Sequence, residues 1–205
     1  MNRRLVLVGG GGHARSLLAV LGDEVQVAGY ADMHPCDGLD IPYLGTDTDC
    51  ITLLDPAEYE VAVTLVSGPD CSMALRRKII ESYHGFSMPM IIAPTAMVAG
   101  CRIGPGVQLM HRTMVNAGAD IGSYSIVNTG AIVEHDCRIG SNVFIGPGAV
   151  ICGGVEIGDD CYIGANVTVR PGVRICAGAV IGLAAAVTKD ITEPRTYVGI
   201  PARPL

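Results

Sequence analysis

A histidine between two acidic residues is the most reactive arrangement in the chain. Glu134, His135 and Asp136 follow one another in the second half of the sequence. An imidazole beside a carboxylate can act as a general base, because the acid fixes the tautomer and raises the basicity of the ring. A polar surface turn is the plainer interpretation of the same residues, and the sequence does not say which acid would hold the ring. His111 has no comparable neighbours, so we interpret it as structural or interfacial.

A glycine-rich segment near the N-terminus is the second candidate site. Residues 9–12 are four consecutive glycines, and with His13 and Ala14 they give the pattern Gly-x-Gly-x-x-Ala after an apolar stretch. In dinucleotide-binding proteins the backbone amides of such a loop, together with a helix N-terminus, bind phosphates. Asp32 follows at the end of the second predicted strand, as an acidic residue does in that fingerprint. The segment alone is a weak signal.

Residues 1–92 have room for only one mononucleotide-binding half, which disfavours an NAD-dependent enzyme. We expect a nucleoside or a diphosphate group to bind here instead. A further contact would come from the carboxyl end of the third predicted strand, which meets the same edge of the sheet. The residues expected to bind this substrate are Gly10, Gly11, Gly12, His13, Asp32, Ser67 and Gly68.

The elements that position this first site alternate between strands and helices. Short apolar runs predict strands, and longer runs with helical spacing predict helices. This alternation with short connections is typical of an α/β domain, a Rossmann-like half with a parallel sheet covered by helices, over residues 1–92. The predicted strands are 4–8, 25–31, 61–66 and 87–92, the predicted helices are 13–21 and 70–83, and a loop is expected at 38–42.

A repeat of six residues replaces this alternation after residue 93. The first positions of the repeat are all large and aliphatic, and the fifth positions are nearly all small or β-branched. The first positions are Met97, Ile103, Leu109, Val115, Ile121, Val127, Val133, Ile139, Ile145, Ile151, Ile157, Ile163, Val169, Ile175, Ile181 and Val187. The last fifth position in this register is Ile191. A repeat of this length defines the architecture of the segment.

A period of six fits neither an ordinary helix nor a hairpin. Three units give a triangular coil of 18 residues, and successive coils stack at about the 4.8 Å spacing of a sheet. This is the hexapeptide-repeat pattern of a left-handed parallel β-helix, which we assign to residues 93–205. Its interior is packed with aliphatic side chains, so any chemistry must lie outside the coil or between subunits. Columns at 18-residue spacing place Gly153, Pro171 and Lys189 in line above His135.

Composition excludes several classes of protein. The 205 residues carry a net charge of −6 and no long basic run, which argues against binding to nucleic acid. No apolar stretch approaches the roughly 20 residues of a membrane span, so we expect a cytoplasmic protein. The eight cysteines form no Cys-x-x-Cys pair, and we interpret them as small buried residues in a reducing compartment.

Several motifs together resemble one family. The resemblance is to the bacterial sugar O-/N-acyltransferases, which include sialic acid O-acetyltransferases and the N-acetyltransferases of UDP-4-amino-4,6-dideoxy sugars and GDP-perosamine. It covers essentially the whole chain, and it is less specific for the acceptor sugar than for the family. It rests on the hexads, the glycine-rich opening at 9–14, the stretch Asn128-Thr129-Gly130-Ala131-Ile132-Val133-Glu134-His135-Asp136-Cys137 and the ending Tyr197-Val198-Gly199-Ile200-Pro201-Ala202.

The resemblance implies a homotrimer whose active sites lie between subunits. It implies that acetyl-CoA lies along the β-helix and that the N-terminal domain holds most of the nucleotide sugar. His135 matches the general base, with Glu134 and Asp136 as candidates to orient it. Asn128 matches a residue near the acceptor amine or hydroxyl, and Gly153 matches a backbone amide that faces the thioester carbonyl.

One position departs from the family pattern. Relatives often carry a second histidine close to acetyl-CoA nine residues after the base, whereas this chain has Phe144. Any mechanism that requires that second histidine is therefore in doubt here. Beyond Phe144 and Gly153, we expect Pro171 and Lys189 to contact the coenzyme along the column above His135, although a solvated surface lysine is the plainer interpretation of Lys189.

The leading hypothesis is N-acetylation of a nucleotide-activated amino sugar in bacterial surface-glycan biosynthesis, with acetyl-CoA as donor. The nearest alternative is O-acetylation of a sugar such as sialic acid at the same site. A γ-type carbonic anhydrase on the same fold needs three histidines for its metal, and the repeat segment offers only His111 and His135, so we expect no metal. A non-enzymatic scaffold of antifreeze type would need outward threonine ladders, which Thr113, Thr129 and Thr168 do not form.

Overall fold

The computed structural model describes residues 3–22, 24–66 and 72–205. Two of the residues expected to bind substrate, Ser67 and Gly68, lie outside these ranges. The chain forms two compact units, Met1–Pro89 and Met90–Leu205. Within the described ranges, no helix is long and apolar enough to cross a membrane.

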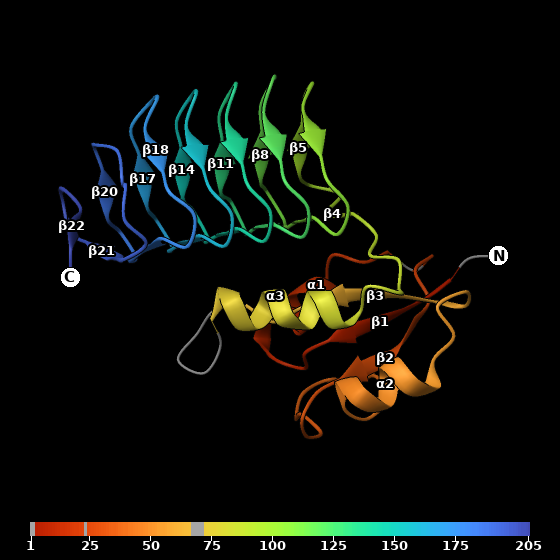
Figure 1. Ribbon diagram of the computed structural model, residues 1–205. Helices are drawn as coiled ribbons and strands as arrows, with labels where there is room; N and C mark the ends of the chain where they lie inside the picture. The colour runs from red at the N-terminus through yellow and green to blue at the C-terminus, as the bar shows by residue number, and fades with distance from the viewer. Residues whose placement is uncertain (1–2, 23, 67–71) are drawn as a thin grey trace. The chain divides into compact units, whose positions relative to one another are not determined.

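The first unit contains a three-stranded parallel sheet. Its strands are β1 (Arg4–Val8), β2 (Val27–Ala31) and β3 (Tyr59–Val63), in the order β2-β1-β3 (Figure 1). The central strand β1 is buried from Leu5 onward, since a strand covered on both faces needs an apolar side chain at every position. The carboxyl ends of all three strands therefore meet at one edge, where the glycine-rich segment begins.

Three helices accompany this sheet. They are α1 (Gly12–Leu18), α2 (Asp47–Leu53) and α3 (Met73–Ser82). The sequence reading missed α2, although Thr46 and Asp49 form a capping box that marks its start: each side chain accepts the backbone N–H of the other. Ser72 caps α3 by accepting the N–H of Leu75.

The predicted boundaries of the first unit are correct only in part. Helix α1 ends at Leu18 instead of residue 21, and β3 begins two residues earlier than expected and ends at Val63. The strand expected over 87–92 is wrong as a single element. Ser87 makes only an isolated bridge to Glu60 within the first unit, while β4 (Ile91–Ile92) belongs to the second unit and pairs there with β7 (Gln108–Leu109).

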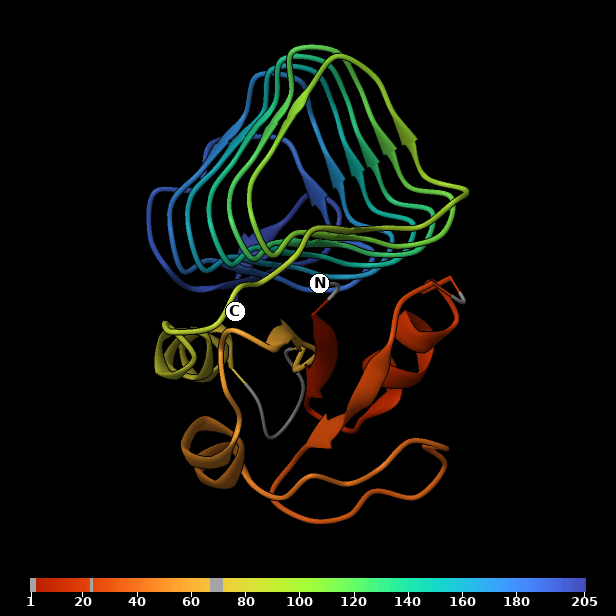
Figure 2. The ribbon, with the colours of Figure 1, turned by 90° about the vertical axis from the view of Figure 1, so that its right-hand side faces the viewer.

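The second unit is a left-handed parallel β-helix built from strands of two residues. Figure 2 shows its triangular coils nearly end-on. Pairing partners lie 18 residues apart through most of the unit, as Ile126 pairs with Phe144 and Phe144 with Tyr162, so three hexads make one coil as the repeat predicts.

The three faces of the coil form three sheets. The first contains β4, β7 (Gln108–Leu109), β10 (Ile126–Val127), β13 (Phe144–Ile145), β16 (Tyr162–Ile163), β19 (Val180–Ile181), β21 (Thr196–Val198) and β22 (Arg203–Pro204). The second contains β5 (Met97–Val98), β8 (Met114–Val115), β11 (Ile132–Val133), β14 (Val150–Ile151), β17 (Thr168–Val169) and β20 (Ala186–Val187). The third contains β6 (Arg102–Ile103), β9 (Asp120–Ile121), β12 (Arg138–Ile139), β15 (Glu156–Ile157) and β18 (Arg174–Ile175).

The aliphatic side chains of the repeat fill the interior of the coil. First positions from Leu109 to Val187 are buried and form one continuous core with the small fifth positions, such as Ala149 and Cys161. Each fully buried Ile or Val contributes about 1.5–3 kcal/mol relative to an exposed one, so the stacked rows stabilise the coil. The corners turn at residues with positive φ, which are mostly Gly, Asn and Asp because these residues adopt that conformation at low cost.

The repeat register shifts at both ends of the β-helix. In the first coil Val98, and not Met97, pairs with Val115, so Met97 leaves the interior row and is 62% exposed. At the other end Ile191 pairs with Ile175, sixteen residues earlier. The corner before Ile191 is therefore two residues shorter than the repeat predicts, and Ile191 takes a first position instead of a fifth.

Candidate active site

His135 lies on the corner between β11 and β12. Glu134 ends the second sheet on this coil, and Asp136 turns the chain toward the third sheet with φ of 59°. The interior positions on either side are Val133 and Cys137, both fully buried. Residues 134–136, called the His135 corner below, therefore stand on a rigid frame with their side chains outside the core.

Asp136 holds the imidazole of His135. Its Oδ2 lies 2.9 Å from Nδ1 of the ring. An ionised carboxylate can only accept a hydrogen bond, so Nδ1 carries the proton and Nε2 keeps its lone pair. Both side chains are largely solvent-exposed in this chain, at 64% and 73%. The pair thus orients the ring with Nε2 on the side away from the carboxylate.

Gly153 lies directly against that ring, one coil further along. A Cβ at position 153 would come within 2.5 Å of Nε2, so only glycine lets the ring keep this position. The N–H of Gly154 donates to the carbonyl of His135 and ties the two corners together. The N–H of Gly153 has no partner among the described residues. A backbone donor and a basic nitrogen therefore lie on adjacent corners, the two groups that acyl transfer needs.

Glu134 has a different partner. Its Oε2 accepts a hydrogen bond of 2.8 Å from Nδ2 of Asn116, which occupies the equivalent position one coil earlier. Sequence reasoning missed Asn116, although its spacing of 18 residues from Glu134 was a usable signal. Of the two acids that flank His135, Asp136 contacts the ring and Glu134 contacts Asn116.

Asn128 lies on another corner of the same coil, before β11. Its Oδ1 accepts the N–H of Thr129 at 2.7 Å, which shapes the turn. Within the described part of the chain, no hydrogen bond joins Asn128 to His135. His111, expected to be structural or interfacial, accepts or donates a bond of 2.8 Å between Nδ1 and the Thr95 hydroxyl.

The residues expected to contact the coenzyme are spread over several coils. Phe144 is buried on the first sheet and stacks on Tyr162, with ring centres 5.0 Å apart. Pro171 is exposed and occupies the position one coil after Gly153. The N–H of Gly153 makes no hydrogen bond within the coil, so the missing N–H of proline at the equivalent position removes no bond. Lys189 is exposed on the shortened last corner, so the strict 18-residue column ends before it.

The glycine-rich segment of the first unit is organised by Asp32. Its Oδ2 accepts the N–H of Gly10 and its Oδ1 accepts the N–H of Met33, both at 2.7 Å. The carboxylate thus occupies the Gly10 amide that the sequence reading assigned to a phosphate. Gly11 is exposed, and a Cβ there would meet nothing within 4 Å, so this part of the loop is open to a ligand.

Two neighbours complete that loop. Gly12 begins α1 and is exposed, whereas His13 is 8% exposed on the helix. Gly10 has no room for a side chain, because a Cβ would lie 2.7 Å from the sulfur of Cys36. The loop is therefore closely packed at Gly10 and open at the two glycines that follow.

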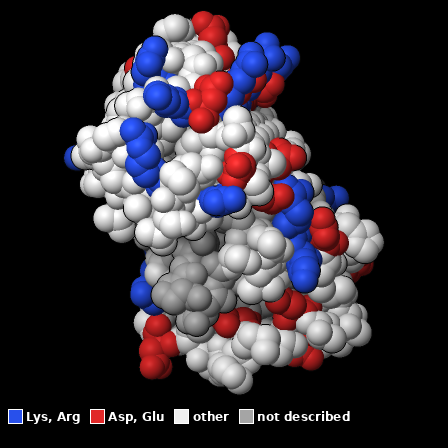
Figure 3. All heavy atoms as spheres, turned by 60° about the vertical axis from the view of Figure 1, so that its left-hand side comes forward, with Lys and Arg blue, Asp and Glu red and all other residues white. Residues whose placement is uncertain are grey.

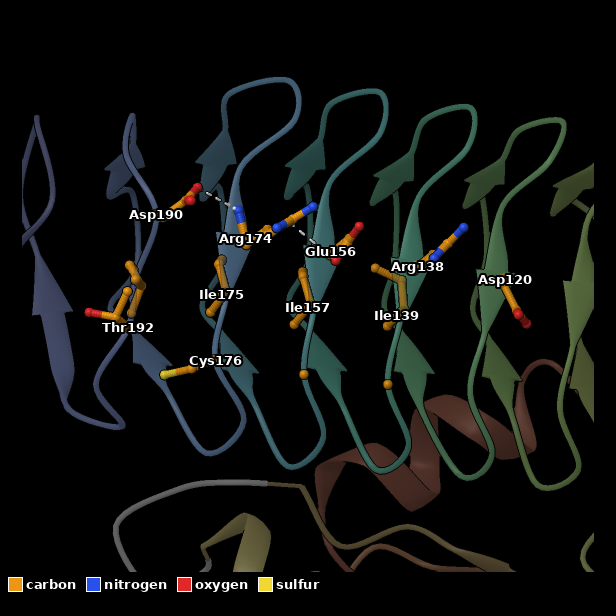
Figure 4. Close-up of a pocket in the computed structure, with 13 residues that line it drawn as sticks. Asp120, Arg138, Ile139, Glu156, Ile157, Arg174, Ile175, Cys176, Asp190 and Thr192 are labelled. Atoms are coloured by element: carbon orange, nitrogen blue, oxygen red, sulfur yellow. Dashed lines mark hydrogen bonds and ion pairs between the residues drawn. The ribbon is translucent and has the colours of Figure 1, made fainter.

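The third sheet carries a row of alternating charges beside the His135 corner. Figure 4 shows Asp120, Arg138, Glu156, Arg174 and Asp190 in this row. Together with aliphatic residues of the same coils they line a groove of about 710 Å³. Nε of Arg174 lies 3.4 Å from Oε2 of Glu156, and the backbone N–H of Arg174 donates to Oδ1 of Asp190. Acidic and basic groups are also mixed on the face in Figure 3, so that face shows no large patch of one sign.

The cysteines and acidic residues form no metal site in the described ranges, where no three His, Cys, Asp or Glu side chains cluster. The seven described cysteines are free thiols. Burial raises the pKa of the Cys161 thiol to about 12, so it stays protonated at neutral pH. Cys137 and Cys161, which are fully buried in the core of the coil, act as small packing residues.

A β-helix of hexapeptide coils with an exposed, oriented histidine on one corner defines a hexapeptide-repeat transferase. Family models agree with this class. Residues 136–171 and 154–182 match the model described as bacterial transferase hexapeptide (six repeats), and residues 115–147 match the hexapeptide repeat of succinyl-transferase.

Solved structures extend the likeness to the whole chain. The acetyltransferase domain of PglB from Neisseria gonorrhoeae FA1090 is 32% identical over 100% of both chains, with a TM-score of 0.90. PerB from Caulobacter crescentus, solved in complex with CoA and GDP-perosamine, is 32% identical over 98% of this chain and 97% of that one, with a TM-score of 0.89. WeeI from Acinetobacter baumannii AYE, at 24% identity and a TM-score of 0.85, shares the fold.

The chain belongs to the bacterial sugar O-/N-acyltransferase family of hexapeptide-repeat acetyltransferases. A sequence comparison with curated proteins finds no match.

Proposed function

We propose that this chain transfers the acetyl group of acetyl-CoA to the amine of a nucleotide-linked amino sugar. The observation that carries the proposal is the full-length likeness to two acetyltransferases. One is the PglB domain, solved also with acetyl coenzyme A, and the other is perosamine N-acetyltransferase, solved with CoA and GDP-perosamine. The His135 corner supplies the chemistry that this transfer requires.

In the proposed reaction His135 acts as the general base. Its Nε2 removes a proton from the acceptor ammonium, and the freed amine attacks the thioester carbon. The N–H of Gly153 donates to the oxyanion of the tetrahedral intermediate. The C–N bond forms in this intermediate. When it collapses, the C–S bond breaks, the nitrogen loses its remaining excess proton to water, and the imidazolium gives its proton to the sulfur, which yields the amide and the CoA thiol. Asp136 stabilises the imidazolium between these steps.

The coenzyme in this proposal lies along the coils that follow His135. Gly153 and Pro171 continue the corner in that direction, and the groove on the third sheet extends over the same coils. This gives an extended pantetheine chain a path with backbone on one side. Lys189, exposed near the end of the coil, would meet the phosphates of the coenzyme, and Phe144 takes the position of the relatives' second histidine without its proton chemistry.

Residues for the acceptor are proposed in each unit by itself. Asn128 would contact the sugar near its amine, and the first unit would bind the nucleotide. Because Asp32 already accepts the N–H of Gly10, we assign the phosphate contacts to the open glycines. The complete proposed set in this unit is Gly10, Gly11, Gly12, His13 and Asp32, with Ser67 and Gly68 beyond the described residues.

We further propose that the active protein is a cytoplasmic homotrimer with a site between neighbouring subunits. The outward residues of the second sheet support this, because most are apolar. They are Met97, Met114, Ile132, Val150, Thr168 and Ala186. A second subunit on this face would bury these side chains and would give the exposed His135 a second wall.

A substrate panel tests the proposal. Release of the CoA thiol from acetyl-CoA is measured with UDP-, GDP- and dTDP-linked amino sugars, with the matching hydroxyl sugars and with free sialic acid. We expect turnover with one or more amino sugar nucleotides and none with the hydroxyl acceptors. Turnover with sialic acid alone would instead establish the O-acetyltransferase alternative, and the absence of turnover with every sugar would reject both.

A further inference from the structure

The two acids of the His135 corner have different partners and therefore different tasks. Asp136 contacts the imidazole, and its Oδ1 lies near Gly118 on the coil before. Glu134 leaves the imidazole alone and takes its hydrogen bond from Asn116. A base needs one orienting carboxylate, so the second carboxylate at this corner calls for another explanation.

The surroundings of Glu134 keep it available to a cation. Asn116 lies on the coil before it and is neutral, and Cys152 lies on the coil after it. Burial and the nearby Glu134 charge raise the pKa of the Cys152 thiol, so that neighbour is uncharged at neutral pH. Within the described ranges, Glu134 makes no ion pair, and its Oε1 has no hydrogen-bond partner. A carboxylate with one oxygen free of hydrogen bonds thus immediately precedes the general base in the chain.

Asn116 fixes the position of this carboxylate. Its own backbone N–H donates to the carbonyl of Val133, so it is part of the stacked frame. Its amide then holds one Glu134 oxygen at 2.8 Å. Because Asn116 contacts only Oε2 of Glu134, the position of Oε1 is fixed while Oε1 itself stays free to accept a hydrogen bond.

We propose that Glu134, positioned by Asn116, binds the protonated amine of the acceptor and makes the site selective for amines over hydroxyls. This inference rests on the proposed function. A sugar amine is largely protonated at neutral pH, and an ammonium offers several N–H donors to a carboxylate. One N–H donates to Glu134 while another faces Nε2 of His135, which takes that proton. A hydroxyl acceptor is uncharged and therefore forms no ion pair with Glu134.

The test measures binding of paired acceptors by calorimetry, without acetyl-CoA. One ligand is an amino sugar nucleotide that the wild type acetylates, and the other carries a hydroxyl on the same carbon. We expect the wild type to bind the amine about tenfold more tightly, the size of one hydrogen bond between charged groups. Glu134→Gln retains an oxygen for Asn116 but removes the charge, so this preference should disappear while binding of the hydroxyl ligand stays unchanged. A preference that survives in Glu134→Gln overturns the proposal.

Asn116→Leu separates positioning from direct contact. It removes the amide donor at similar size, so the preference for the amine should fall by several-fold without vanishing. In the Glu134→Gln background the same change should have no further effect on the preference, because Asn116 acts only through Glu134. Independent, additive losses would show that Asn116 does not act through Glu134.

Two controls keep the result interpretable. Asp160→Asn makes the same change of acid to amide at another corner, where Asp160 accepts a hydrogen bond from Asn142, and it should leave the preference intact. Glu134→Asp keeps the charge and should retain part of the preference, which guards against a folding defect in the glutamine variant. If the wild type acetylates no amino sugar nucleotide, the proposed function fails; if it does and Glu134→Gln keeps the preference, only this inference fails.

Discussion

Two corners of the same β-helix carry the same types of residue, an asparagine paired with an acid, but serve different purposes. At the corner between the third and first sheets, Asn142 donates to Asp160 at 2.7 Å, and Asp159 accepts the N–H of Ser141 at 2.7 Å. These polar groups are used to join one coil to the next. At the His135 corner Asn116 donates to Glu134 in the same way, from one coil to the next. There, however, Nε2 of His135 and the N–H of Gly153 have no partner in the described structure. The repeat builds both corners, and chemistry arises where it leaves polar groups unpaired.

Removing the base should have the largest effect. We expect His135→Ala to lower turnover ~10²–10⁴-fold, the usual contribution of a general base. Its side chain lies outside the core rows of Val133 and Cys137, so its loss opens no cavity, and the melting temperature should stay within a few degrees of the wild type. Steady-state kinetics and thermal melting on the same samples check both parts. A large drop in melting temperature would show that His135 is structural.

The next largest effect is expected at Asp136, and Asp160 is its matched control because the two aspartates share one backbone conformation. Asp136 and Asp160 both have φ of 59°, a conformation that Asn also adopts readily, so Asp→Asn leaves either turn intact. Asp136→Asn removes the charge that orients His135 and should lower kcat by about 10- to 100-fold. This is less than the loss in a buried serine-protease triad, because Asp136 is exposed.

Asp160→Asn should leave kcat unchanged, since the Asp160 carboxylate accepts a hydrogen bond from Asn142 at a different corner. Equal losses in the two variants would mean that the comparison between the two corners is wrong, and that both acids act on the stability of the coil.

A smaller effect is expected at Gly153. Gly153→Ala places a methyl group where the His135 ring now lies, so the ring must move and kcat should fall by about tenfold. Gly85→Ala is the matched control, because a Cβ there meets only Pro56 at an ordinary 3.9 Å. If both changes leave kcat unaltered, the close approach of Gly153 to the ring does not matter for transfer.

The smallest effect is expected at the far end of the coil. The chain has two lysines, and Lys189→Ala should raise the KM for acetyl-CoA a few-fold at low salt, as for an exposed ion pair with a phosphate. Added salt should reduce this difference by screening. Lys78→Ala, on α3 of the first unit, should not change the KM. An unchanged KM in Lys189→Ala would identify Lys189 as an ordinary surface residue.

The two units also differ in how much of each the sequence predicts. In the second unit, sixteen hexads repeat one physical requirement, an aliphatic residue facing the interior, so the architecture is predictable from Leu109 to Val187. The ends fail because register at a terminal coil depends on pairing with a single neighbour: Met97 points outward and Ile191 moves into the interior row. In the first unit each element has its own short signal, and the capping box of α2 at Thr46 was overlooked.

The candidate site was predictable in its centre and less so in its contacts. His135 and its two acids stand out as residue types, but the choice of Asp136 over Glu134 as the partner of the ring depends on the direction of side chains at a left-handed turn. Asn116 becomes visible only when the 18-residue coil is applied to Glu134. At the glycine loop, Asp32 occupies the Gly10 amide, which is a contact that the fingerprint alone does not specify.

The central claim, that Nε2 of His135 takes the proton of the acceptor, is tested most directly by chemical rescue. Acetyl transfer by His135→Ala is measured with increasing imidazole, against the same additions to the wild type and to Asp136→Asn. We expect imidazole to restore a concentration-dependent part of the lost turnover in His135→Ala and to add little in the other two proteins. Near-normal turnover in His135→Ala without imidazole would contradict the account, because the amine would then react by positioning and oxyanion stabilisation alone.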